Sequence, residues 1–220
     1  MGFDLDSIAQ EGLRFFGRIS ASISHEIKNV LAILNENAGL LEDLILMSEK
    51  GMPLNTERIK SVAATMKNQI KRGDLITKNM NTFAHSIDEP LLKVDVYETL
   101  ELIVALTKRF ADMHEVKLEL LDLPAKSAIS TSPFFLKNLI YRCIDYAINS
   151  TGEDRTVHIS TQKEGNAILI KFSNLKDLSE NSHEGFPTER ENGLAELLKA
   201  DIGIDRVAGC ITISLHENID

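Results

Sequence analysis

Residues 13–50 read LRFFGRISASISHEIKNVLAILNENAGLLEDLILMSEK and carry one continuous pattern. Apolar residues recur there at spacings of three, four or seven, which is typical of the buried seam of a coiled coil or helical bundle. Asn37 is a polar exception on this seam. The pattern predicts one amphipathic helix, roughly 55 Å long at a rise of ~1.5 Å per residue. Its seam residues are Phe16, Ile23, Ile27, Val30, Leu34, Leu41 and Leu44.

A second helix of the same kind follows. Gly51-Met52-Pro53 stops the first helix, and Asn55 or Thr56 is suited to cap the next one. Two long helices joined by a short loop form an antiparallel hairpin, which leaves half of its apolar surface exposed. We therefore expect a homodimer in which two hairpins form a four-helix bundle. The second seam comprises Ile59, Val62, Met66, Ile70, Ile76, Met80 and Phe83.

The first helix carries a histidine, a carboxylate and an amide outside its seam. His25 lies two residues from both Ile23 and Ile27, and each residue turns a helix by ~100°, so His25 points away from the seam. Glu26 is its neighbour, and Asn29 lies one turn on, on the same face as His25. An imidazole nitrogen can attack phosphorus, and a carboxylate that accepts a hydrogen bond from the other nitrogen raises its nucleophilicity. Asn29 is suited to orient a water molecule or a phosphoryl oxygen. The trio predicts phosphohistidine chemistry.

Two other interpretations of His25 are weaker. Most surface histidines are simply solvated, but the complete string from Ser24 to Asn29 on a bundle-type helix favours a chemical role. A helical zinc site needs a second histidine one turn along, and Asn29 occupies that position.

The segment from Phe16 to Leu44, with Ser-His-Glu-Ile-Lys-Asn at its centre, resembles the phosphoacceptor box of two-component sensor histidine kinases. That box belongs to their dimerisation and histidine-phosphotransfer domain. The resemblance implies that His25 is the phosphorylated residue and that Glu26 is its acid/base partner. The Glu-x-x-Asn pattern of Glu26 and Asn29 resembles the one with which those domains dephosphorylate a response regulator.

The composition excludes several classes of protein. A net charge of −9 argues against nucleic-acid binding driven by phosphate contacts. Cys143 and Cys210 both lie in apolar contexts, which indicates buried thiols in a reducing compartment. There is neither an apolar run long enough to span a bilayer nor a secretory signal. We expect a cytoplasmic protein with no membrane and no nucleic-acid partner.

Pro90 marks the expected boundary between two domains, 1–89 and 90–220, because it disfavours helix at the preceding residue. Short alternating segments then replace the long seam. They predict an α+β chain in which the helical hairpin is followed by an α/β sandwich. The expected strands cover 94–96, 116–121, 156–162, 167–173 and 211–215, and the expected helices cover 97–113, 133–149 (with Ser132 as its cap) and 192–205.

The order of these elements resembles the catalytic ATP-binding domain of histidine kinases, and the resemblance implies three nucleotide-contacting places. All three are altered. Arg142 and Tyr146 stand where two asparagines are expected, and tyrosine is a poor magnesium ligand. The segment 173–177 lacks the expected aspartate at the strand end and the glycines that follow it. Gly193 alone represents a Gly-rich phosphate loop.

We therefore expect a phosphotransferase, similar to the dimeric histidine phosphotransferases of bacterial phosphorelays, which carry a vestigial ATP-binding fold. It would pass phosphoryl groups between receiver-domain aspartates of response regulators through His25. No cofactor of its own is expected, since the partner receiver supplies Mg²⁺, and ATP binding is not expected. Two alternatives stay open: a divergent but active ATP-dependent sensor histidine kinase, and a catalytically dead dimeric adaptor that binds response regulators.

Overall fold

The computed structural model describes residues 5–121, 128–176, 178 and 185–216. The chain forms two compact units. One contains residues 20–82, and the other contains the chain up to Ile19 together with the chain from Phe83 onward. The first helix, α1 (Leu5–Glu49), therefore contributes to both units. A domain boundary between residues 89 and 90 stays a prediction.

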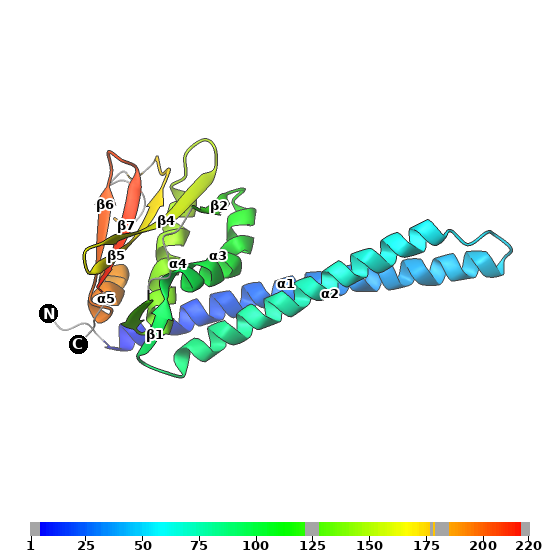
Figure 1. Cartoon of the computed structure of the whole chain (residues 1–220), viewed down its shortest axis with the longest axis horizontal. Helices are drawn as coiled ribbons and strands as arrows, with labels where there is room; N and C mark the ends of the chain where they lie inside the picture. The colour runs from blue at the N-terminus through cyan, green and yellow to red at the C-terminus, as the bar shows by residue number, and fades with distance from the viewer. Residues whose placement is uncertain (1–4, 122–127, 177, 179–184, 217–220) are drawn as a thin grey trace. The chain divides into compact units, whose positions relative to one another are not determined.

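Residues 20–82 contain the predicted helical hairpin, in which α1 and α2 (Thr56–Ala84) run antiparallel (Figure 1). Gly51 ends the first helix in the left-handed region, with φ of 89°, which only glycine adopts without strain. The Asn55 side chain caps α2 by accepting a hydrogen bond from the Arg58 amide at 3.0 Å. Both helices are confirmed, although α1 begins at Leu5, earlier than predicted.

The other unit is an α/β sandwich around a mixed sheet. The sheet has the strand order β2-β4-β5-β7-β6, in which β2 and β4 are parallel and the other neighbours are antiparallel. β1 and β3 form a separate antiparallel pair. A short 3-10 helix, η1 (His85–Ile87), precedes β1. The remaining elements are β1 (Leu92–Asp95), α3 (Val96–Met113), β2 (Lys117–Leu120), β3 (Ala128–Thr131), α4 (Pro133–Asn149), β4 (Thr156–Glu164), β5 (Ala167–Ser173), α5 (Glu189–Leu197), β6 (Ala200–Asp205) and β7 (Cys210–His216).

One face of the sheet carries the core. Along β5 the side chains alternate, so that Ile168, Ile170 and Phe172 are buried while the residues between them are half-buried. Helices α3, α4 and α5 lie together beside the sheet (Figure 1) and provide the opposite side of this core. Helix α4 is the most deeply buried element, because it lies between α3 and α5 and also contacts β5. The predicted sandwich is confirmed.

An aromatic cluster connects the first part of α1 to α4. Phe15 lies edge-on to Phe83, with ring centroids 5.3 Å apart, and contacts Tyr141 at 5.1 Å. Phe134 completes the cluster at 5.6 Å from Phe15. Aromatic pairs in this range contribute roughly 0.5–1.5 kcal/mol each beyond their buried area. The cluster fixes the residues of α1 before Ser20 against α4.

One local prediction is wrong, and one strand was missed. Residues 192–205 are not one helix: α5 ends at Leu197 and β6 follows, because Ala200–Asp205 pairs along β7. The strand β3 was not expected at all. The predicted N-cap position of Ser132, with Pro133 in the first turn of α4, is confirmed, although the Ser132 side chain makes no capping hydrogen bond.

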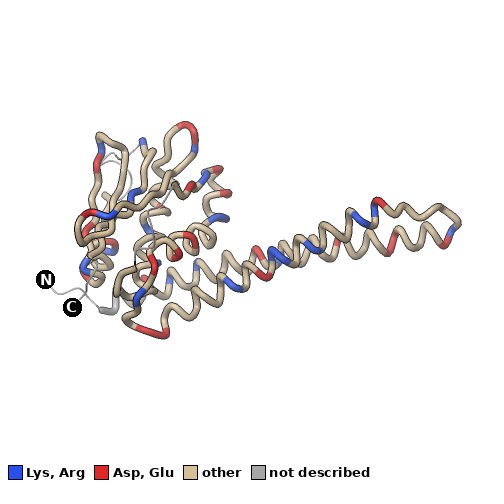
Figure 2. The backbone as a smooth tube through the Cα atoms, in the orientation of Figure 1, with Lys and Arg blue, Asp and Glu red and all other residues tan. Residues whose placement is uncertain are grey.

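Charges of both signs are interspersed along the backbone of each unit (Figure 2). Among the described helices, none combines the length and apolar character needed to cross a membrane.

Candidate functional site

His25 is exposed on α1, within the hairpin unit. Asn29, one turn further along, is exposed as well. Neither side chain has a hydrogen-bond partner among the residues that the structure describes. The imidazole of His25 is therefore accessible to a reacting group from outside the chain, with the Asn29 amide on the same side of the helix.

Glu26 is held by a residue that the sequence did not reveal. Arg72 of α2 reaches across the hairpin, and its Nη2 lies 3.3 Å from Oε2 of Glu26. The Glu26 side chain is only 20% exposed, while that of Arg72 is 46% exposed. Glu26 therefore points toward α2 in this structure, and the expected hydrogen bond from His25 to Glu26 is not formed among the described residues.

A glycine lies beside this ion pair. A Cβ on Gly73 would meet Cγ1 of Val30 at 3.5 Å, so α2 comes close to α1 at this level. Val30 is 4% exposed and Arg72 precedes Gly73, so the close approach brings the base of the Arg72 side chain toward α1. Finding Arg72 from the sequence would require the register of the two helices to within one turn.

At the positions where the sequence resemblance implies nucleotide contacts, the side chains contact other residues of the same chain. Tyr146 of α4 stacks on Phe186, with ring centroids 4.3 Å apart and an angle of 19° between the rings. Phe186 belongs to the segment before α5 and is 8% exposed. The Phe186 ring thus lies against the residue at the position where the sequence resemblance implies a magnesium-binding asparagine.

Arg142, at the other altered asparagine position, forms a buried ion pair. Its Nε lies 2.5 Å from Oε1 of Glu191, which is fully buried in α5. The Thr188 amide donates to the other carboxylate oxygen of Glu191 at 2.8 Å, forming a capping box. Burial raises the pKa of Glu191, but the hydrogen bond from Thr188 and the charge of Arg142 outweigh it, so the pKa is lowered.

The residues that follow β5, where the resemblance implies an aspartate and glycines, also contact other residues of the chain. The Asn174 amide donates to both oxygens of Asp154, at 3.0 and 2.8 Å, and to the carbonyl of Thr156. The Lys176 stem lies over Gly152, where a Cβ would meet its Cδ at 3.3 Å. The last residue of the segment 173–177, Asp177, lies outside the described residues.

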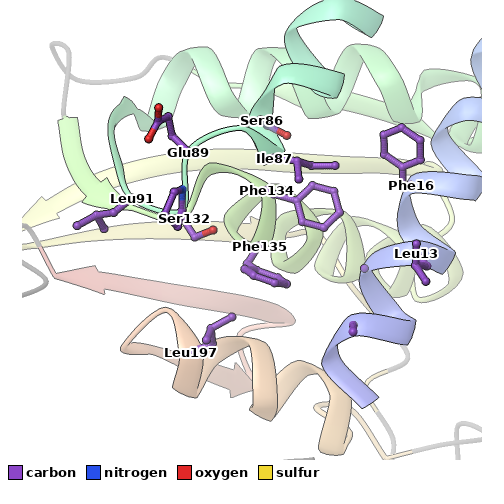
Figure 3. Close-up of a pocket in the computed structure, with 13 residues that line it drawn as sticks. Leu13, Phe16, Ser86, Ile87, Glu89, Leu91, Ser132, Phe134, Phe135 and Leu197 are labelled. Carbon is purple, nitrogen blue, oxygen red and sulfur yellow. The ribbon is translucent and has the colours of Figure 1, made fainter. Parts of the chain in front are cut away.

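A large apolar cavity of about 790 Å³ lies in the α/β unit, between the first turns of α1, the segment after η1 and helix α4 (Figure 3). Phe134 and Phe135 of α4 line it together with Leu13 and Phe16 of α1. Neither His25 nor the altered nucleotide positions line this cavity. Within the part of the chain that the structure describes, no group of three or more histidine, cysteine, aspartate or glutamate residues is placed to hold a metal ion.

No protein-family model and no curated protein matches the chain. The histidine kinase AdeS of Acinetobacter baumannii is 15% identical, with 89% of this chain and 98% of AdeS covered and a TM-score of 0.49. The histidine kinase ThkA, solved in complex with the response regulator protein TrrA, is 16% identical, with 95% and 64% covered and a TM-score of 0.47. The cytoplasmic segment of the histidine kinase QseC is 14% identical, with 68% and 95% covered and a TM-score of 0.43.

These solved structures are histidine kinases, which is the family that the sequence resembles.

Proposed function

We propose that the protein is a histidine phosphotransferase of a two-component phosphorelay. It passes phosphoryl groups between the receiver-domain aspartates of response regulators through His25. The single observation that carries this proposal is an accessible imidazole with no partner among the described residues, next to a carboxylate held by an arginine on the facing helix. This arrangement suits a nucleophile that waits for a phosphoryl donor from another protein.

In the proposed step, a ring nitrogen of neutral His25 attacks the phosphorus of a receiver's aspartyl phosphate. The N–P bond forms as the P–O bond breaks, and the aspartate carboxylate leaves with the electron pair. The positive charge that develops on the imidazole is stabilised by a carboxylate that accepts a hydrogen bond from the other ring nitrogen. Glu26 takes this role by turning from Arg72 toward the ring. The reverse step loads a second receiver.

Arg72 has two uses in this scheme. Its guanidinium holds the Glu26 carboxylate toward α2 before the donor arrives. Once Glu26 turns to the imidazolium, the released guanidinium is free to donate to oxygens of the transferring phosphoryl group, a geometry that suits arginine. We propose Glu26 as the acid/base partner, Asn29 as the residue that orients a phosphoryl oxygen or water, and Arg72 as a positioning residue.

We further propose that the protein neither binds ATP nor needs a metal of its own, because the receiver brings the Mg²⁺ that neutralises phosphoryl charge. The contacts of Tyr146 with Phe186 and of Arg142 with Glu191 support this proposal. Both sets of side chains would have to separate before a nucleotide entered, and separation would leave the buried Glu191 carboxylate without its arginine.

The hairpin unit has exposed apolar side chains, and they support the proposal of a homodimer. A four-helix bundle formed with a second copy would cover such side chains, and large exposed apolar patches on a soluble protein mark interaction sites. The exposed large apolar residues of this unit are Leu31, Ile45, Leu46, Met47, Met52, Leu54, Ile70 and Leu75.

Replacing His25 with Gln separates a transferase from an adaptor. The test measures both the binding of a receiver domain to the full chain and the transfer of labelled phosphate from that receiver. A transferase loses all transfer in His25→Gln while the receiver still binds. If His25→Gln retains both binding and signalling output in cells, the adaptor is the better description.

A further inference from the structure

Four guanidinium groups line one small cavity in the α/β unit. Arg14 and Arg18 come from α1, Arg142 from α4 and Arg190 from α5. The cavity has a volume of about 160 Å³. We call it the arginine cavity. The aromatic cluster described above holds these residues of α1 against α4, so the arginines are placed by packed elements.

In the described part of the chain, the arginine cavity has fewer carboxylates around it than it has arginines. Glu11 is shared, because its Oε1 lies 2.7 Å from Arg14 and 3.3 Å from Arg190. Arg142 pairs with Glu191 and lies 3.9 Å from a carboxylate oxygen of Asp145. Within the described ranges, three carboxylates thus face four guanidinium groups. Since arginine does not lose its proton in proteins, the excess positive charge persists at all ordinary pH values.

Among the described residues, the hydrogen-bond partner of Arg18 is a neutral group rather than a carboxylate. Nη1 of Arg18 lies 3.3 Å from the hydroxyl of Tyr141, and Arg18 forms no salt bridge with any residue that the structure describes. The Tyr141 hydroxyl oxygen accepts a hydrogen bond from one N–H group of Arg18. The other N–H groups of this guanidinium are left for a ligand. Arg18 is therefore the residue most suited to bind an added anion.

An independent observation points to the same place. Asn138 of α4 also lines the arginine cavity, and it is 1% exposed. Its side-chain nitrogen has no hydrogen-bond partner among the described residues. A buried donor without an acceptor is costly, and native proteins rarely keep one without a reason. An oxygen in the cavity would accept from the Asn138 amide.

We propose that the arginine cavity binds a small oxyanion of the phosphate class, either inorganic phosphate or the phosphate of a small monoester. Such an anion has oxygens on all sides and suits several guanidinium forks at once. The cavity is smaller than the 300–1,000 Å³ typical of pockets for organic ligands, so it does not accommodate a whole nucleotide. This site gives the α/β unit a ligand of its own and is independent of the transfer proposed for His25.

The test is calorimetric titration of the full chain, purified without phosphate, at pH 7 and constant ionic strength set with chloride. Inorganic phosphate and methyl phosphate are titrated separately, with acetate as a comparison. We expect saturable phosphate binding that is at least tenfold weaker in Arg18→Gln and clearly weaker in Asn138→Leu. Binding of phosphate with exclusion of methyl phosphate identifies the free ion as the ligand, and comparable binding of both identifies a monoester as acceptable.

Arg58→Gln is the matched control, because Arg58 is an exposed arginine of α2 outside the cavity, and it should leave the affinity unchanged. If circular dichroism shows that Arg18→Gln does not fold, Arg14→Gln takes its place. Three results would overturn the proposal: no saturable phosphate binding, equal affinity in the folded Arg18→Gln or Arg14→Gln variant, or ATP displacing phosphate with the higher affinity. His25→Gln should bind phosphate as the wild type does, so failure here leaves the transfer proposal standing.

Discussion

Arg72 lies 3.3 Å from Glu26 and connects the two helices of the hairpin next to His25. Because the pair is partly exposed, its contribution to stability is below about 1 kcal/mol. We predict that Arg72→Gln changes the free energy of unfolding by less than this amount but lowers the rate of phosphotransfer from a receiver about fivefold, since the guanidinium positions Glu26 and the phosphoryl group.

Lys71→Gln removes the same charge from the neighbouring exposed position and serves as control. It should leave the transfer rate unchanged, and Arg72→Lys should recover only part of the rate because lysine lacks the bidentate fork. Rapid-quench transfer assays measure all three variants. A transfer rate of Arg72→Gln equal to that of wild type would contradict the positioning role.

Breaking the Arg142–Glu191 pair should destabilise the α/β unit. Glu191→Gln leaves a largely buried guanidinium without its carboxylate, and we expect a loss of about 3 kcal/mol at pH 7, measured by urea denaturation. The pKa of Glu191 is lowered by folding, so its contribution is present above the pKa of an unfolded glutamate, about 4.3, and is lost as the pH falls through the lower folded value. The gap between variant and wild type should narrow in acid. An unchanged gap at pH 3 would contradict this.

Lys137 carries a buried charge that costs stability. It is 5% exposed, its Nζ donates to the carbonyl of Pro133 at 3.2 Å, and burial lowers its pKa to about 8. We predict that Lys137→Met raises the free energy of unfolding by about 2 kcal/mol at pH 7.

The pH dependence of this effect has a definite sign. Between pH 8 and about 10.4 the unfolded chain holds a proton on Lys137 that the folded chain has released, so the wild type gains stability as the pH rises. The advantage of Lys137→Met should therefore shrink between pH 7 and pH 9.5. Urea denaturation at both pH values measures it, and an advantage that grows with pH would refute the assignment.

The proposed homodimer predicts a specific variant. Ile70 on α2 is 53% exposed, and Ile70→Glu would place a charge in the apolar surface that a second copy is expected to cover. We predict that sedimentation velocity finds a dimer for the wild type and a monomer for Ile70→Glu. Asn68→Glu adds the same charge at an exposed position of the same helix and should remain dimeric. A monomeric wild type at micromolar concentration would exclude the four-helix bundle.

The long helices were predictable because their apolar repeat extends over many turns, and local periodicity dominates in such a segment. The end of the α/β unit was not. Residues 200–205 have no periodicity that separates a strand from a helix, and Ala200 to Asp205 become a strand through pairing with Cys210 to Leu215 of β7. A four-residue strand such as β3 likewise depends on its partner β1. Tertiary contacts decide whether these segments form strands or helices.

The candidate site divides in the same way. The exposed, shared face of His25 and Asn29 was predictable because the two residues lie one turn apart on one helix, where spacing alone sets their geometry. Their chemical roles, and that of Glu26, stay predictions. Arg72 was not predictable, since its meeting with Glu26 depends on the register across the hairpin. The contact of Tyr146 with Phe186 likewise joins residues far apart in the sequence.

The most direct test of the account uses two phosphate donors. The wild type and His25→Gln are incubated with labelled ATP and Mg²⁺ and, separately, with a receiver domain that carries labelled phosphoaspartate. Phosphotransfer through His25 predicts label on the wild type from the receiver alone, and none on His25→Gln. Label on His25 from ATP without any receiver would contradict the account and identify an active histidine kinase.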